Sequence, residues 1–228
     1  MAAGLLLLGG CSGAPTEPTS ERTSEPTGSR PSATPSASVS ASVQPSDPVE
    51  PATYHSDGEP QRALLSVPRI GLRELLVVPY VGWTDDAPGT RIQNGGKAAS
   101  PHGPRGGVGP GGIGNYQVTA HRLSSTRAFE HLPDLRRGDL VHVEAGGVRY
   151  TYRVVETRQT SFRSPRSLLE QRAAVPGEPG LEPTRAMITL STCATIEDHA
   201  AGNWWADRFD NPEHRIDKIG VLVSSRKA

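Results

Sequence analysis

The 228-residue sequence is short of cysteine, of net charge and of long apolar runs. Its two cysteines, Cys11 and Cys193, lie far apart in unlike surroundings, and no Cys-x-x-Cys pair is present, which argues against a disulfide scaffold, a zinc site or a dithiol redox centre. Lys and Arg together number 24, as do Asp and Glu, and there is no basic stripe that would bind nucleic acid. No apolar run reaches the roughly 20 residues needed to span a bilayer.

The N-terminal residues read MAAGLLLLGGC, a short apolar run of the size of a signal-peptide core. The tetrad Leu8 to Cys11 resembles a bacterial lipobox, in which the cysteine is lipidated and becomes the mature N-terminus. No Lys or Arg precedes the leucines, and the first basic residue is Arg22. We therefore predict that residues 1–11 are a signal peptide with lipidation at Cys11, or the remnant of a membrane anchor. Cleavage elsewhere with free secretion is the third alternative.

Residues 12–55 are dominated by Ser, Thr, Pro, Ala and Glu, without a hydrophobic period. Such a segment buries too little apolar surface to offset the entropy lost on ordering. We predict a disordered stalk of about 35 Å end to end, which holds a folded domain away from a membrane.

Residues 56–228 are predicted to form one mainly β domain. Short apolar runs bounded by Gly and Pro predict strands, and the Gly146-Gly147 pair predicts a hairpin turn. The Gly- and Pro-rich stretch 89–114 predicts a loop, and Ala128 to Leu132 at most a short helix stopped by Pro133. One helical turn is expected at 165–172. This pattern favours an antiparallel-rich barrel or sandwich with short helices. The predicted strands are 63–68, 74–79, 115–121, 140–144, 148–157, 185–192 and 215–224.

Cys193 is the candidate nucleophile. It closes a predicted strand and has polar neighbours, Ser191 and Thr192 among them. A buried structural thiol is the alternative, since free cysteine packs as a small hydrophobe. If Cys11 carries lipid, however, Cys193 has no disulfide partner in an oxidising compartment, which favours a reactive role.

A cysteine nucleophile needs a base to form the thiolate and an acid for the leaving amine, and histidine serves both near neutral pH. Among seven histidines, His121 ends a predicted strand as Cys193 does, whereas His199 and His214 remain rivals in the polar segment after Cys193. Arg215 begins the last predicted strand and could stabilise an oxyanion. The alternative for Arg215 is a surface ion pair with neighbouring acidic residues.

Taken in order, Thr119-Ala120-His121-Arg122, Leu190-Ser191-Thr192-Cys193 and Arg215 resemble the sortase family. The spacings of 72 residues from His121 to Cys193 and of 22 from there to Arg215 fit a sortase barrel with a helical insertion. The likeness extends from Val67 to Val223. Within the family the chain most resembles the class E and F sortases of high-GC actinobacteria. It departs from them mildly at Ala120, where the small-Gly-His form of the motif has Gly, and in a longer, more acidic stretch between Cys193 and Arg215.

The resemblance implies an eight-stranded barrel and a transpeptidase. We predict no cofactor and assign no residue as a metal ligand. Cys193 would attack the Thr-Gly bond of a C-terminal LPxTG- or LAxTG-like motif and form a thioester, which an amine of a peptidoglycan precursor or a pilin then resolves. His121 would carry the proton, and Arg215 would hold the oxyanion. Thr192 and the backbone N–H of Ala194 are further candidate oxyanion donors. The enzyme would act outside the cytoplasm, anchored to the membrane.

Three rival functions remain. NlpC-type hydrolases place Cys before His, and L,D-transpeptidases have a Ser-x-Gly stretch before Cys, which Ser191-Thr192-Cys193 lacks. A non-catalytic binding module would use Trp204-Trp205 as a ligand platform.

Asp207, Asp210 and Glu213 could bind calcium, although solvated loop charges are the simpler interpretation.

Overall fold

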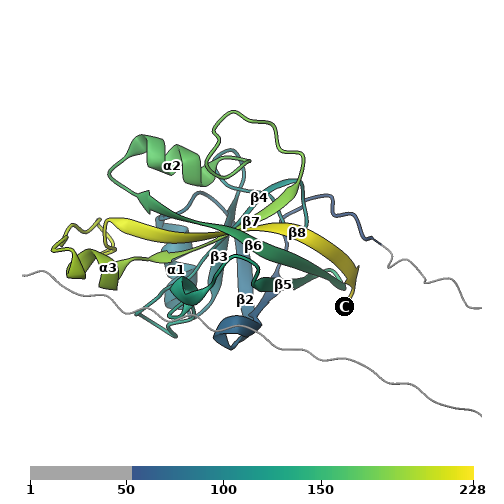
Figure 1. The fold of residues 1–228 in the computed structure, drawn as a ribbon, viewed down its shortest axis with the longest axis horizontal. Coiled ribbons are helices and arrows are strands. Elements are labelled where there is room, and N and C mark those ends of the chain that lie inside the picture. Colours follow the sequence, from purple (N-terminus) through teal and green to yellow (C-terminus); the bar gives the residue numbers. More distant parts are fainter. Residues whose placement is uncertain (1–52) are drawn as a thin grey trace, which may run out of the picture. The chain divides into compact units, whose positions relative to one another are not determined.

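Eight strands close into a barrel in the computed structural model, which describes residues 53–228 (Figure 1). The predicted stalk and the lipobox with Cys11 lie outside the described residues, apart from residues 53–55. The strands are β1 (Ala63–Val67), β2 (Leu72–Val81), β3 (Ala98–His102), β4 (Gly114–Thr119), β5 (Leu140–Ala145), β6 (Val148–Ser161), β7 (Ala186–Cys193) and β8 (His214–Lys227). The helices are α1 (Ala87–Asn94), α2 (Pro165–Arg172) and α3 (Thr195–Ala200), with 3₁₀ turns η1 (Pro68–Ile70) and η2 (Leu132–Asp134).

The strands follow one another around the barrel in the order β1-β2-β3-β4-β7-β8-β6-β5, and β5 closes onto β1. Only β2–β3 and β4–β7 are parallel, and the other six pairs are antiparallel. The predicted eight-stranded, antiparallel-rich barrel is therefore confirmed. Closure leaves no long exposed edge on which another chain could pair.

The barrel core follows from residues that alternate between the two faces of each strand. In β5, Val141 and Val143 are buried while Leu140 is exposed, because successive side chains point to opposite faces. Tyr152 from β6 and Ile188 from β7 are completely buried in the same cluster. Each such side chain contributes about 1.5–3 kcal/mol through burial.

The prediction of a loop over residues 89–114 is wrong for its first part. Helix α1 begins after Asp86, whose carboxylate accepts a hydrogen bond from the Gly89 N–H at 2.8 Å, and a proline stands in its first turn. Small residues then allow β3 to lie buried between β2 and β4. The density of Gly and Pro concealed both elements.

Proline also marks boundaries less sharply than predicted. Pro79 does not end its strand: β2 continues to Val81, Pro79 lies opposite Ser100 of β3, and β1 pairs with β2 only as far as Val77. The predicted short helix at 128–132 is a turn that leads into η2, and Pro133 lies inside η2. The hairpin at Gly146-Gly147 is confirmed, with φ of 57° and 76° at the two glycines.

Strand β8 runs the length of the barrel between β6 and β7. Near its C-terminal end, the Ser225 hydroxyl donates a hydrogen bond of 2.7 Å to the Tyr54 carbonyl, so the start of the described chain lies beside the end of β8. Within residues 53–228, none of the helices has the length and apolar character required to cross a membrane.

Candidate active site

The parallel pairing of β4 and β7 brings two predicted site residues to one rim of the barrel. Both strands run in the same direction with Thr119 opposite Ser191, so they end together. Cys193 is the last residue of β7, and His121 follows β4 by two residues. Beyond the ladder, the Ala120 N–H donates to the Ser191 carbonyl at 3.3 Å, which carries the pairing almost to His121.

The third predicted residue, Arg215, stands directly opposite Cys193 in the β7–β8 register. Because β8 is antiparallel to β7, its beginning meets the end of β7. Arg215 is buried, which excludes the surface ion pair considered as its alternative.

Cys193, His121 and Arg215 line one small pocket of about 10 Å³, room for about one water molecule. The structure therefore brings together the three residues that the sequence singled out. The other lining residues are Asp85, Thr90, Gln93, Thr119, Ala120, Ser191, Thr192 and Asn211.

The Cys193 thiol is partly buried and faces an acceptor. Its Sγ lies 3.7 Å from Oδ1 of Asn211, whose amide nitrogen donates to the Asp207 carboxylate at 3.1 and 3.2 Å. Burial raises the pKa of the thiol, the carboxylates of Asp85 and Asp207 raise it further, and Arg215 opposes them. The surroundings therefore favour the protonated thiol at rest.

His121 is held by Asn94, the last residue of α1. The imidazole Nε2 lies 2.7 Å from Oδ1 of Asn94, so Nε2–H donates and Nδ1 carries the lone pair in the neutral ring. Burial lowers the pKa of His121. A neutral imidazole with a free nitrogen is the form of histidine that can take a proton from a thiol.

The Arg215 guanidinium is fixed by several acceptors. Its Nε donates to Oδ1 of Asp85 at 3.0 Å, and Nη1 donates to the carbonyls of Pro212 at 2.6 Å and His214 at 3.3 Å. Among residues 53–228, the buried Nη2 has no hydrogen-bond partner, and its nearest ionic neighbour is the Asp207 carboxylate at 3.6 Å. Burial alone would lower the pKa of Arg215, but the surrounding anions, Asp85 foremost, outweigh it and raise the pKa.

The two candidate oxyanion donors both have partners already. The Thr192 hydroxyl donates to the Ala120 carbonyl at 2.8 Å, and the Ala194 N–H donates to the His214 carbonyl at 2.9 Å. Each would have to leave its bond before it could serve a substrate. In the described structure, Arg215 Nη2 is better placed for that task.

The rival histidines have other partners. His199 stacks on Trp204 with ring centroids 4.0 Å apart, and His214 Nδ1 pairs with the Asp198 carboxylate at 2.7 Å. Neither lines the pocket.

Several residues that shape the site were assigned no functional role from the sequence. Arg122 donates to the Cys193 carbonyl at 3.3 Å and pairs with Glu197 of α3, which ties the segment after His121 to the segment after Cys193. Its place beside His121 in the motif was a usable signal. Asp85 and Asn211 reach the pocket from two separate connections, and nothing in the local sequence marks them.

The three carboxylates considered for calcium do not converge. Asp207 holds Asn211 and faces Arg215, Asp210 is exposed, and Glu213 accepts from Ser161 at 2.7 Å and from Asn203 at 3.0 Å. Within residues 53–228 no group of three or more His, Cys, Asp or Glu side chains is arranged to hold a metal ion.

Both the sequence and the closed barrel are similar to known proteins. A family model described as the sortase domain matches residues 65–207, a range that includes His121 and Cys193. The search of curated proteins gave no match.

Three solved structures illustrate the likeness of the fold. The SrtA sortase from Actinomyces oris is 17% identical with a TM-score of 0.55, covering 78% of this chain and 88% of its own. Sortase E1 from Streptomyces coelicolor, solved with a tripeptide in its active site, is 20% identical with a TM-score of 0.54, covering 76% and 94%. Sortase E from Streptomyces avermitilis is 22% identical with a TM-score of 0.53, covering 76% and 93%.

The family match spans more than half of the chain, so this chain belongs to the sortase family. Sortases are cysteine transpeptidases that act on sorting-motif substrates and amine acceptors.

Proposed function

We propose that this sortase cleaves the Thr-Gly bond of a C-terminal LPxTG- or LAxTG-like motif and transfers the new acyl end to an amine of a peptidoglycan precursor or a pilin. The observation that carries the proposal is the shared pocket of Cys193, His121 and Arg215 at the ends of three neighbouring strands. A nucleophile, a proton carrier and a fixed cation are the groups that acyl transfer requires.

In the first half-reaction, His121 takes the proton of the Cys193 thiol as the sulfur attacks the threonine carbonyl carbon. The carbonyl oxygen becomes an oxyanion, for which Arg215 Nη2 is the unpaired donor. When the intermediate collapses, the carbon–nitrogen bond to glycine breaks. The imidazolium then gives its proton to the leaving amine, and a thioester on Cys193 remains.

In the second half-reaction, the acceptor amine attacks the thioester carbonyl, and His121 takes a proton from the attacking nitrogen. The carbon–sulfur bond breaks as an amide forms. The leaving sulfur receives the proton back from His121, which restores the neutral pair. Burial favours these neutral forms, because it raises the pKa of the thiol and lowers that of the imidazole.

We place the enzyme in the class E and F group, outside the cytoplasm and anchored to the membrane through lipidated Cys11. The motif residues His121, Cys193 and Arg215 and the lipobox-like tetrad ending at Cys11 support this assignment. Two of the structural relatives are sortases E, which agrees with the class although their low identity speaks only to the fold.

A covalent adduct provides the direct test. The protein from residue 53 onward is incubated with a sorting-motif peptide and examined by intact-mass spectrometry. We expect an acyl adduct on Cys193 and none on Cys193→Ala, which should keep the fold because a small side chain at a strand end is lost. Peptide cleavage by a well-folded Cys193→Ala variant would refute the proposal.

The product ratio separates a transpeptidase from a protease. Both form the same thioester, but water resolves it in one case and an amine in the other. We expect slow release of free acid in buffer, and faster turnover to amide as a glycine-type or diamine acceptor is added. If only free acid forms with every amine tried, the protein is a hydrolase on a sortase barrel.

A further inference from the structure

Asp85 lies in the connection between β2 and α1 and makes an ion pair with a residue 130 positions away. Its Oδ1 accepts the hydrogen bond from Arg215 Nε at 3.0 Å, and the Arg215 side chain at this pair is only 3% exposed. The contact has a single point of attachment. Oδ2 of Asp85 and Nη2 of Arg215 are both buried without a hydrogen-bond partner in the part of the chain that the structure describes, whereas a two-point pair would have satisfied both.

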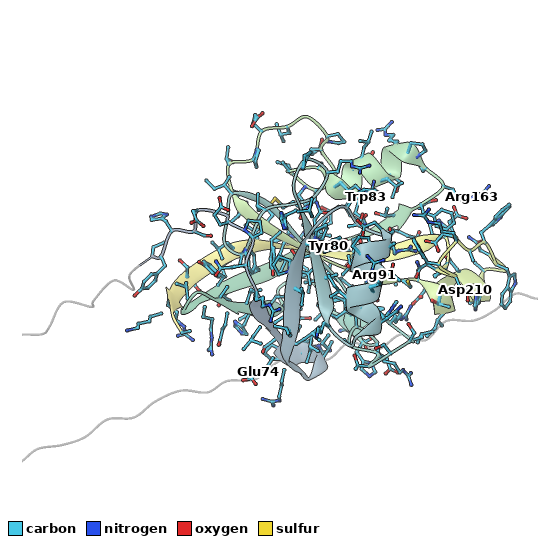
Figure 2. The ribbon with its side chains drawn as sticks, turned by 180° about the vertical axis from the view of Figure 1, so that it is seen from behind. Glu74, Tyr80, Trp83, Arg91, Arg163 and Asp210 are labelled. Atoms are coloured by element: carbon cyan, nitrogen blue, oxygen red, sulfur yellow. The ribbon has the colours of Figure 1, made fainter. Side chains whose placement is uncertain are left out.

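Both neighbours of Asp85 are anchored, so its position is set from two sides. Thr84 is held by α2: its hydroxyl donates to Gln171 at 3.0 Å, and Arg172 donates to its hydroxyl at 2.9 Å and to its carbonyl at 3.0 Å. Asp86 caps α1 through Gly89 and also accepts from the Trp83 N–H at 3.1 Å. In Figure 2, Trp83 lies beside α2, and Trp83, Asp85 and Arg172 of α2 line one pocket.

The backbone of Asp85 is left-handed, with φ of 67°. Residues other than glycine rarely adopt this conformation, although Asp and Asn tolerate it best. Strain of this kind persists where the surroundings over-determine it, and it gathers at functional sites. At Asp85, the left-handed backbone directs the carboxylate at the guanidinium of Arg215, which the proposed mechanism uses.

We propose that Asp85 is a positioning residue for Arg215: it holds Nε so that Nη2 is the donor left free for the substrate carbonyl. The inference rests on the proposed function of Arg215. The two carbonyl acceptors on Nη1 come from the β7–β8 connection and the start of β8, so Asp85 is the anchor that comes from another part of the chain. Asp207 is close to the guanidinium but forms no hydrogen bond with it.

The same carboxylate acts on the thiol, which provides a readout that does not depend on turnover. The charged groups around Cys193 are Asp85 and Asp207, which raise its pKa, and Arg215 and Arg122, which lower it. Burial is the largest cause of the raised pKa and is unaffected by an Asp-to-Asn change. His121 lines the same pocket and is the remaining titratable group.

Two variants separate the charge of Asp85 from its hydrogen bond. Asp85→Asn keeps an acceptor oxygen and tolerates the left-handed backbone, while Asp85→Ala loses both the charge and the acceptor. The matched control is Asp210→Ala, since Asp210 has a similar φ of 60° but is exposed and lies in the β7–β8 connection. Each protein from residue 53 onward is assayed for kcat and KM with the sorting-motif peptide, for the pH dependence of Cys193 alkylation by iodoacetamide, and for its melting temperature.

We expect Asp85→Asn to shift the alkylation midpoint to lower pH and to keep kcat within a few-fold. Asp85→Ala should lower kcat about tenfold with little change in KM. This loss is smaller than the roughly 10²- to 10³-fold loss that follows complete removal of an oxyanion donor. Asp210→Ala should match the unmodified chain. Wild-type kcat in Asp85→Ala, a faster Asp85→Ala, or equal losses in the two Asp85 variants would each overturn the proposal. If the peptide is not a substrate at all, the proposed function fails. The alkylation experiment still tests Asp85 by itself, because an alkylation midpoint that stays unchanged in Asp85→Asn would contradict the proposed role of Asp85.

Discussion

The Thr192 hydroxyl donates a hydrogen bond of 2.8 Å to the carbonyl of Ala120, so the residue before Cys193 is joined to the residue before His121. The two site motifs, 72 residues apart, are therefore connected by a side chain at the point where the backbone pairing of β4 and β7 runs out. Thr192 is buried, so water cannot replace this bond.

Thr192→Val tests this connection. Valine keeps the shape but leaves the buried carbonyl of Ala120 without that donor, which should lower the free energy of unfolding by about 1–3 kcal/mol. We expect kcat to fall as His121 loses its alignment, and Thr192→Ser to restore both quantities. Denaturant unfolding and peptide kinetics measure them. Loss of kcat with unchanged stability would indicate instead that the hydroxyl serves the oxyanion.

Truncating the His121 or Arg215 side chain should lower kcat/KM strongly. His121→Ala and Arg215→Ala should each lower kcat/KM by roughly 10²-fold or more, because one removes the proton carrier and the other the cation opposite the thiol. His199→Ala is the matched control, since His199 stacks on Trp204 and does not line the pocket. An essential His199 together with a dispensable His121 would contradict the assignment.

The pH profile should have a broad plateau. Burial lowers the pKa of His121 and raises that of Cys193, so the two values move apart. Activity should fall on the acid side as His121 becomes protonated, below its ordinary value of about 6.5, and on the alkaline side as the thiol ionises, above its ordinary value of about 8.5. The pH dependence of kcat/KM gives two apparent pKa values, which belong to the coupled Cys193–His121 pair. Cys193 alkylation with a midpoint well below 8.5 would show that the thiolate is favoured at rest.

The N-terminus can be examined separately. We predict that the mature protein begins at Cys11 and carries acyl chains, because Leu8-Gly9-Gly10-Cys11 resembles a lipobox. Mass spectrometry of the membrane-extracted protein measures the N-terminal peptide, and a Cys11→Ala chain is the control. An unmodified peptide that runs through Cys11 would favour another anchor.

The barrel and the positions of Cys193 and His121 at the ends of strands could be predicted because they depend on local patterns. Alternating apolar residues marked the strands, and Cys193 and His121 both followed such a run. Parallel pairing of those two strands then places their ends together at one rim. The local sequence favoured a surface position for Arg215, and its burial could not be predicted because burial depends on the complete fold.

Contacts between distant segments could not be predicted in this way. Asp85 acquires its role from a partner 130 residues away and from a left-handed backbone, and neither leaves a local pattern. Helix α1 was hidden for a different reason. Its capping Asp86 and the proline that follows were visible, but the surrounding Gly and Pro favoured a loop.

The course of β8 also determines how the enzyme can be presented. Arg215 lies at one end of this strand and Ser225 near the other, about 30 Å away along ten residues. Tyr54 is bonded to Ser225, and Figure 1 shows the C-terminus at the end of β8 away from α3. A support or fusion partner coupled at either Thr53 or Ala228 is therefore attached at the pole opposite the thiol, which leaves the reactive rim open to peptides in solution.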